Sequence, residues 1–226
     1  MTPTTVAPAV RHDVSIALRG FDLPGRITIP SRPRGLVMLA HEAGRSGSDA
    51  RDRVLTDRLL DLGFGTLELD LLAPHEVGTV DGQRDLDVLA VRLLVATRWL
   101  RAHQSAGGQP VGYFGSLSGA AVALLAAAED PAIGAVVARS GRLDLAGPCL
   151  PTVQAPTLLI VGGADSASRE VNERAESSLR CAHELVLVPR ATELFAEPGT
   201  FETAARLTGA WFVHHLRPNP TKGETT

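Results

Sequence analysis

The sequence predicts a single α/β domain with a mostly parallel central sheet and helices on both faces. Short apolar segments of strand length alternate with longer segments that repeat apolar residues at helical spacing, which is typical of strand–helix–strand units. The 226 residues, 44% hydrophobic and 21% charged, suit one domain with an ample core. We expect that domain at residues 14–216, between a flexible N-terminus (1–13) and a disordered tail (217–226).

The first half of the chain predicts an opening hairpin and then strand–helix units. Gly20 and the pair Pro24 and Gly25 are turn-forming residues between two short strand-like runs. Further on, apolar residues recur on one helical face in each of two segments. The expected strands are residues 14–18, 26–29, 36–40 and 66–69, and the expected helices are residues 49–62 and 84–102.

The second half continues the alternation. An alanine-rich helix follows its first strand, and small side chains let such a helix lie close to a sheet. The strands at 133–138 and 157–161 have no insertion between them long enough to build a large lid. Parallel sheets place their sites at the carboxyl ends of the strands, so we expect the site in those loops. The expected strands are 111–114, 133–138, 157–161 and 185–188, with an alanine-rich helix that ends at 128 and further helices over 168–179 and 201–216.

Composition restricts the function classes. The net charge of −3 and the dispersed arginines do not form the basic footprint of a nucleic-acid-binding protein. Lys222 is the only lysine, which argues against a Schiff-base mechanism. Without a signal peptide or an apolar span, the chain is expected to be cytoplasmic, with no membrane partner. Cys149 and Cys181 lack metal-ligand spacing, and neither a metal nor an organic cofactor is expected. We expect a small-molecule substrate, and a homodimer is compatible with the sequence.

One segment, residues 112–121, has the pattern of a nucleophile elbow, the sharp strand-to-helix turn that exposes a reactive side chain above a sheet. Such a turn needs small residues two before, two after and three after its centre. With Leu117 at the centre, those positions are Gly115, Gly119 and Ala120. We therefore expect Leu117 to hold the strained elbow backbone without offering a reactive atom.

Four segments together resemble the α/β-hydrolase superfamily, and within it the dienelactone-hydrolase-like branch, over nearly the full length of the chain. The resemblance implies the α/β-hydrolase fold without a large lid. It also implies catalytic residues in the order nucleophile, acid, histidine. The segments are residues 41–44 (His-Glu-Ala-Gly), 112–115 (Gly-Tyr-Phe-Gly), 156–165 (ending in Gly-Gly-Ala-Asp) and 194–199 (Leu-Phe-Ala-Glu-Pro-Gly).

By this resemblance, the acid falls on Asp165, the nucleophile on Leu117 and the histidine on Glu193. Glu42 falls on a position beside the nucleophile. A leucine forms no acyl intermediate, and a glutamate does not replace an imidazole oriented by an aspartate. The resemblance therefore implies a degenerate triad in which the usual esterase mechanism is lost.

Ser118 is the alternative nucleophile, because the small-residue pattern is still satisfied when the elbow shifts by one residue. Ser116 does not fit, since Phe114 would then occupy a position that requires a small residue. The base for Ser118 would come from His75, His41 or the carboxylates. The competing interpretation makes Ser118 a cap for the following helix.

The remaining carboxylates offer acid/base chemistry. Glu42, Glu193 and Asp165 would share one partly desolvated cleft, where like charges keep at least one carboxyl group protonated. Glu193 and Glu42 would then serve as general acid and base in a cyclisation, dehydration, isomerisation or lyase step on a small, largely apolar substrate. The expected pocket residues are Leu117, His41, Ala43, Ser116 and His75.

Two other functions stay open. One is an ester or lactone hydrolase that uses Ser118. The other is a non-catalytic pseudoenzyme that binds a small molecule or acts as a scaffold, in which Glu193 pairs with Arg139, Arg142 or Arg190. Asp144 is expected to be a turn or ion-pair residue.

Overall fold

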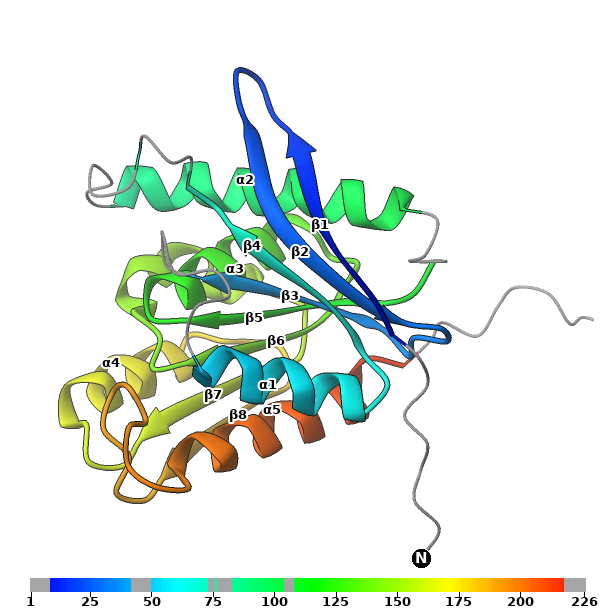
Figure 1. The fold of residues 1–226 in the computed structure, drawn as a ribbon. Helices are drawn as coiled ribbons and strands as arrows, with labels where there is room; N and C mark the ends of the chain where they lie inside the picture. Colours follow the sequence, from blue (N-terminus) through cyan, green and yellow to red (C-terminus); the bar gives the residue numbers. More distant parts are fainter. Residues whose placement is uncertain (1–8, 42–49, 73–75, 77–82, 104–107, 218–226) are drawn as a thin grey trace, which may run out of the picture.

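The computed structural model describes residues 9–41, 50–72, 76, 83–103 and 108–217. Its core is an eight-stranded sheet in the order β1-β2-β4-β3-β5-β6-β7-β8 (Figure 1). β1 and β2 run antiparallel to their neighbours, and β3 to β8 are parallel. The strands are β1 (Ala9–Ala17), β2 (Asp22–Pro30), β3 (Leu36–His41), β4 (Gly65–Asp70), β5 (Val111–Ser116), β6 (Ile133–Arg139), β7 (Thr157–Gly162) and β8 (His183–Val188).

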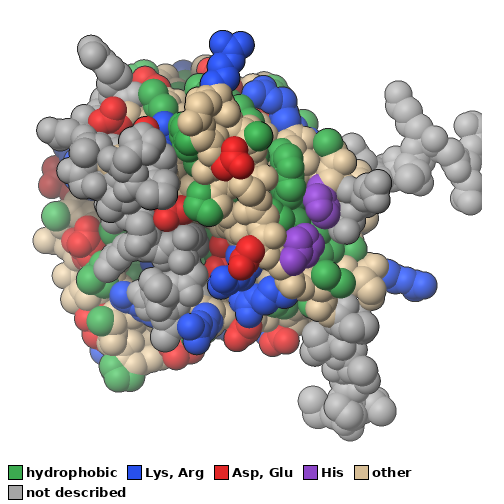
Figure 2. All heavy atoms as spheres, turned by 45° about the horizontal axis from the view of Figure 1, so that its top comes forward, with side chains coloured by type: hydrophobic (Ala, Val, Ile, Leu, Met, Phe, Trp, Pro, Cys, Tyr) green, Lys and Arg blue, Asp and Glu red, His purple; other side chains and the backbone are tan. Residues whose placement is uncertain are grey.

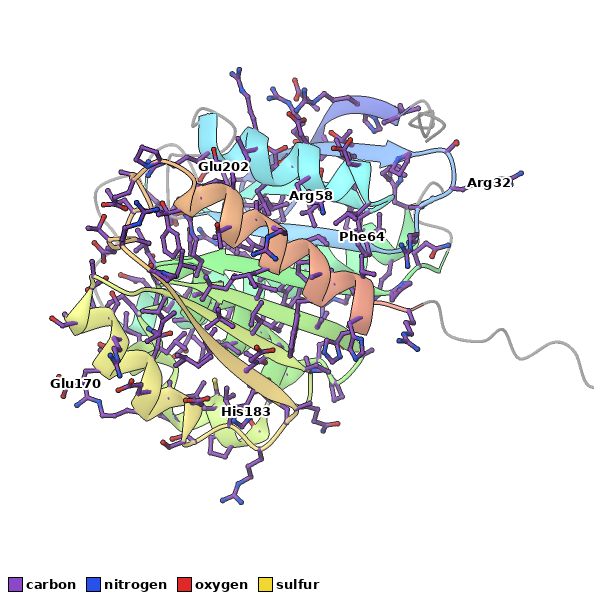
Figure 3. All side chains as sticks on the ribbon, turned by 90° about the horizontal axis from the view of Figure 1, so that it is seen from below. Arg32, Arg58, Phe64, Glu170, His183 and Glu202 are labelled. Atoms are coloured by element: carbon purple, nitrogen blue, oxygen red, sulfur yellow. The ribbon has the colours of Figure 1, made fainter. Side chains whose placement is uncertain are left out.

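Helices cover both faces of the sheet, as the sequence predicts. One face packs against α2 (Gln83–Ala102), α3 (Ser118–Glu129), α4 (Ser166–Glu176) and the 3-10 segment η3 (Leu143–Thr152). The other packs against α1 (Ala50–Asp61) and α5 (Thr200–His215). Figure 3 shows α1 and α5 side by side across this second face, where the rings of Phe64 and Phe212 lie 6.2 Å apart.

The opening hairpin differs from the prediction in two respects. β1 begins at Ala9, inside the segment that was expected to be flexible, because it pairs along its whole length with β2. Pro24 and Gly25 lie within β2 and do not form the turn. The turn is closed by the Leu18 N–H donating to the Phe21 carbonyl, and Gly20 supplies its positive φ of 94°.

The other expected elements are confirmed, with ends that differ by a few residues. β5 runs to Ser116, directly before Leu117. The chain between β6 and β7 forms η3, which packs on α3 and α4 and had no counterpart in the prediction. Among the described residues, no helix is both long and apolar enough to cross a membrane. Both cysteines are free thiols.

Candidate functional site at the carboxyl edge of the sheet

The elbow between β5 and α3 is present, and Leu117 is at its centre. Leu117 has φ 52° and ψ −124°, a combination that costs a leucine free energy and confirms the expected strained backbone. Gly115 shows why the turn needs small residues. A Cβ on Gly115 would collide with the Gly119 carbonyl oxygen and lie 2.6 Å from the Ala120 Cα.

Hydrogen bonds to the chain after β6 hold the elbow. The Leu117 N–H donates to the Arg139 carbonyl over 3.2 Å, and the Arg142 N–H donates to the Leu117 carbonyl over 3.1 Å. The side chains of Leu117, Ser116 and Ser118 are all half-buried. Ser118 is the first residue of α3, and the positive φ falls on Leu117, one residue earlier.

Asp165 lies at the carboxyl end of β7 and caps α4. Its Oδ1 accepts a hydrogen bond from the Ser168 N–H at 3.1 Å. Its Oδ2 is buried and has no hydrogen-bond partner among the residues described. One carboxylate oxygen therefore has a structural role, and the other is left without a described donor.

Glu193 lies in the loop that joins β8 to α5. The Phe195 N–H donates to the Thr192 carbonyl over 3.1 Å, so Glu193 is the second residue of a β-turn. Phe195 follows the turn with φ 54° and a buried ring. The Glu193 side chain is exposed to solvent.

The Asp165 and Glu193 loops lie against each other. The Ala164 N–H donates to the Ala191 carbonyl at 2.9 Å, and the Gly163 N–H donates to the Val188 carbonyl at 2.8 Å. A Cβ on Gly162 would lie 2.6 Å from the carbonyl oxygen of Thr192. The close approach of these two backbones requires glycine at position 162.

Arg142 and Asp144 form an ion pair beside the elbow, as expected for Asp144. The guanidinium donates to both carboxylate oxygens, at 3.0 and 2.9 Å. This hydrogen bonding raises the pKa of Arg142, with a smaller electrostatic contribution from Glu193, and it lowers the pKa of Asp144. Asp144 is thus both the hydrogen-bonding and the ion-pair partner of the Arg142 guanidinium.

The loops after β5, β7 and β8 thus bring the positions of Leu117, Ser116, Ser118, Asp165 and Glu193 to one edge of the sheet, since these strands are close together in its order. The backbone of His41 ends β3 at the same edge. Glu42, Ala43 and His75 lie outside the residues that the structure describes, so their predicted roles stay predictions.

Ser140, which sequence reasoning did not assign to the site, joins its loops, and so does Arg139, which was expected only as one possible ion-pair partner of Glu193. Ser140, which follows β6, donates a hydrogen bond from Oγ to the Glu193 carbonyl oxygen at 2.9 Å. Arg139 places its guanidinium among the rings of Phe114, Phe195 and Phe201, 4.8 to 5.9 Å from their centroids. No spacing in the sequence signals either contact, because both join residues far apart in the chain.

Charge is mixed on the surface near the hairpin and α2. Figure 2 shows acidic and basic side chains interspersed on this face. On α2, Arg92 forms a bidentate ion pair with Glu76, with distances of 2.6 and 2.7 Å. The same guanidinium donates to the Leu71 carbonyl at 2.9 Å, which ties Glu76 to the end of β4.

Comparison with known proteins identifies the family. No protein-family model matches the chain. A dienelactone hydrolase of Anabaena variabilis has a crystal structure that matches with a TM-score of 0.88 and 41% identity, covering 92% of this chain and 99% of that one. An esterase of Pyrococcus furiosus shares the fold at a TM-score of 0.74 and 18% identity, covering 92% of each chain.

Mycobacterium tuberculosis has a protein named "Putative phosphoribosyl transferase" that is 43% identical over 217 residues, which are 95% of this chain and 49% of that protein. The chain therefore spans about half the length of the curated relatives it matches. The fold and the Anabaena relative together define the class as an α/β-hydrolase-fold protein. Within that class, the chain belongs to the dienelactone hydrolase family.

Proposed function

We propose that this member of the family performs carboxylate acid/base catalysis on a small, largely apolar substrate, and that it has lost hydrolysis through a serine or cysteine nucleophile. The observation that carries the proposal is Leu117 at φ 52° in an intact elbow. Backbone strain of this kind costs roughly 1–3 kcal/mol and persists only where the surrounding structure enforces it. The frame of the site is kept at that cost, while its centre offers only an apolar side chain.

The carboxylates supply the chemistry that the elbow lacks. Glu193 sits in a hydrogen-bonded turn beside the loop of Asp165, so its backbone has a defined conformation although its side chain reaches solvent. Glu42, which the family resemblance assigns to the elbow's neighbourhood, would be its partner. Leu117 would form the apolar floor, and the reaction would be a cyclisation, dehydration, isomerisation or lyase step.

The test compares single substitutions during a search for turnover. The full chain is incubated with a small-molecule extract, and mass spectrometry follows products that are isomers of a consumed compound or have lost water or another small fragment. Glu193→Gln and Glu42→Gln should each reduce that conversion by at least about 100-fold. Glu202→Gln, an exposed glutamate on α5, is the matched control and should convert normally. Conversion that survives both substitutions would overturn the proposal.

Hydrolysis through Ser118 is the second candidate, supported by its half-buried position directly after the elbow centre. The location of the positive φ at Leu117 argues against it, because an elbow nucleophile itself occupies the strained position. A fluorophosphonate probe separates the two candidates. We expect no labelling of the full chain, whereas labelling that disappears in Ser118→Ala would establish the hydrolase.

A non-catalytic binding protein is the third candidate, and the exposure of Glu193 to solvent favours it. Native mass spectrometry of the purified chain distinguishes this case, since a ligand that is retained and recovered unchanged indicates binding without turnover.

We attribute the phosphoribosyl transfer named for the mycobacterial relatives to the half of those proteins that this chain does not match. This chain, which matches the other half, has the hydrolase fold. Incubation of this chain with a phosphoribosyl donor should release no pyrophosphate.

A further inference from the structure

Ser140 occupies a backbone position that is unfavourable for serine. It follows β6 directly, is only 1% exposed and has φ 45°. Its N–H donates to the Ile160 carbonyl at 2.8 Å, which continues the ladder toward β7. A glycine would adopt this φ with less strain but would have no hydroxyl group. The serine side chain is therefore the feature that needs an explanation.

The Ser140 hydroxyl is part of a two-point attachment to the Glu193 loop. Its Oγ donates to the carbonyl oxygen of Glu193 at 2.9 Å. On α1, Arg51 donates from Nη1 to the next carbonyl oxygen, that of Leu194, at 2.7 Å. These two carbonyls belong to the peptide planes on either side of the Leu194 Cα, so the two bonds restrict backbone rotation at position 194. The planes on either side of the Glu193 Cα are held by the Ser140 bond and by the Phe195 N–H, which donates to the Thr192 carbonyl.

The same short segment also holds the elbow. Arg139, the neighbour of Ser140, accepts the hydrogen bond of the Leu117 N–H through its carbonyl and places its guanidinium 5.6 Å from the Phe195 ring centroid. Arg139 and Ser140, at the end of β6, therefore contact the elbow on one side and the Glu193 loop on the other. These contacts set the distance between the elbow and the Glu193 loop.

We propose that Ser140 is a positioning residue that fixes the backbone of residue 193, and with it the point from which the side chain starts, relative to the elbow. The functional part of this inference rests on the proposed function, because it assumes that the side chain at 193 acts above Leu117. The geometric part does not, because it concerns the backbone hydrogen bond alone.

The geometric part is tested in the natural chain by NMR. Three-bond couplings between amide and α protons report φ at Glu193 and Leu194, and we expect one conformation in the natural chain and conformational averaging in Ser140→Gly, which removes the hydroxyl while relieving the φ strain. Ser177→Ala removes a comparable hydroxyl-to-carbonyl bond on α4 and should leave the couplings unchanged. Averaging in the natural chain, or equal couplings in Ser140→Gly, would overturn the inference.

The functional part is tested in a chain that carries Leu117→Ser and Glu193→His, assayed with p-nitrophenyl acetate. Adding Ser140→Gly or Ser140→Ala should lower kcat by about tenfold, the effect of one lost hydrogen bond, with KM within about twofold. A rise in KM alone, or an unchanged kcat, counts against positioning. If the doubly substituted chain has no esterase activity while the couplings still respond to Ser140→Gly, the assumption that the side chain at 193 acts above Leu117 fails and the backbone role of Ser140 stands.

Discussion

The elbow and the Glu193 loop hold the two ends of the same site by different means. The elbow combines backbone hydrogen bonds of Leu117 with a close approach of two backbones that leaves no room for a Cβ on Gly115. The loop is held by side chains from distant elements, Ser140 and Arg51, that donate to its carbonyl groups. A position with no room for a Cβ accepts only glycine, whereas a loop held by several hydrogen bonds can lose one of them and keep the others. We therefore expect substitutions in the elbow to lower the free energy of unfolding more than comparable substitutions in the loop.

The largest change in the free energy of unfolding is expected from Gly115→Ala, which tests the elbow. The new Cβ would collide with the Gly119 carbonyl, and neither backbone can move without dismantling the strand-to-helix turn. We expect a loss of about 3 kcal/mol in the free energy of unfolding, measured by urea denaturation. Gly147→Ala in η3 is the control, because nothing lies within 4 Å of its Cβ position. An equal loss in both variants would contradict the steric account.

Gly162→Ala tests the same contact type on the loop side and should cost less. Its Cβ would collide with the Ala191 carbonyl oxygen and lie 2.6 Å from the Thr192 carbonyl oxygen, in a loop that we expect to give way more easily because it lies outside the strands and helices. A loss of about 1–2 kcal/mol is expected in the same urea experiment. A loss as large as that of Gly115→Ala would show that the loop is as rigid as the elbow, and the comparison would fail.

Leu117→Gly should change the stability of the fold by a smaller amount and in the opposite direction. Glycine adopts a positive φ at little cost, so removing the strained leucine should stabilise the chain by up to about 1 kcal/mol, less the packing of a half-buried side chain. Thermal unfolding is the measurement. Ser118→Gly, one residue further in the first turn of α3, should instead destabilise. A destabilised Leu117→Gly chain would mean that leucine is retained for packing.

The smallest expected effect is the pH dependence of the stability that Glu197 contributes in the Glu193 loop. The Thr192 N–H and hydroxyl donate to the two Glu197 oxygens at 3.0 and 2.7 Å, and these bonds lower the pKa of Glu197. A carboxyl group whose pKa is lower in the folded state stabilises the fold above its unfolded pKa, and this contribution disappears as the pH falls through the folded pKa. Thr192→Val removes the hydroxyl bond. The stability difference from the natural chain should be present at pH 7 and shrink toward pH 3, and Thr192→Ser should preserve it.

The local parts of this site could be read from the sequence. Gly115, Gly119 and Ala120 are the small residues that an elbow centred on Leu117 needs, and they lie within six residues of sequence. The elbow and its strained centre were therefore predictable. Asp165 follows a buried strand after two intervening residues, so its place at the carboxyl edge was predictable, whereas its role as the cap of α4 was not predicted because the helix was expected to begin at residue 168. Alternating apolar segments were enough to order the strands and helices, because each element signals itself.

Contacts between residues that are far apart in the chain could not be predicted from the sequence. The Ser140 hydroxyl bond to the Glu193 carbonyl joins residues 53 positions apart, and a lone serine after a strand carries no pattern. The prediction placed a turn at Pro24 and Gly25, whereas pairing with β1 and β4 keeps both in a strand. Tertiary pairing decided the local structure there, against the local turn signal.

The central claim is that the frame of a hydrolase site survives here without its reactive groups. The most direct measurement is p-nitrophenyl acetate hydrolysis by the chain that carries Leu117→Ser and Glu193→His together, compared with each single substitution. The account predicts that the pair, with Asp165 in place, turns over the ester about 100-fold faster than either single variant, because the three residues act as a unit. A doubly substituted chain that folds normally yet hydrolyses no faster than the single variants would contradict it.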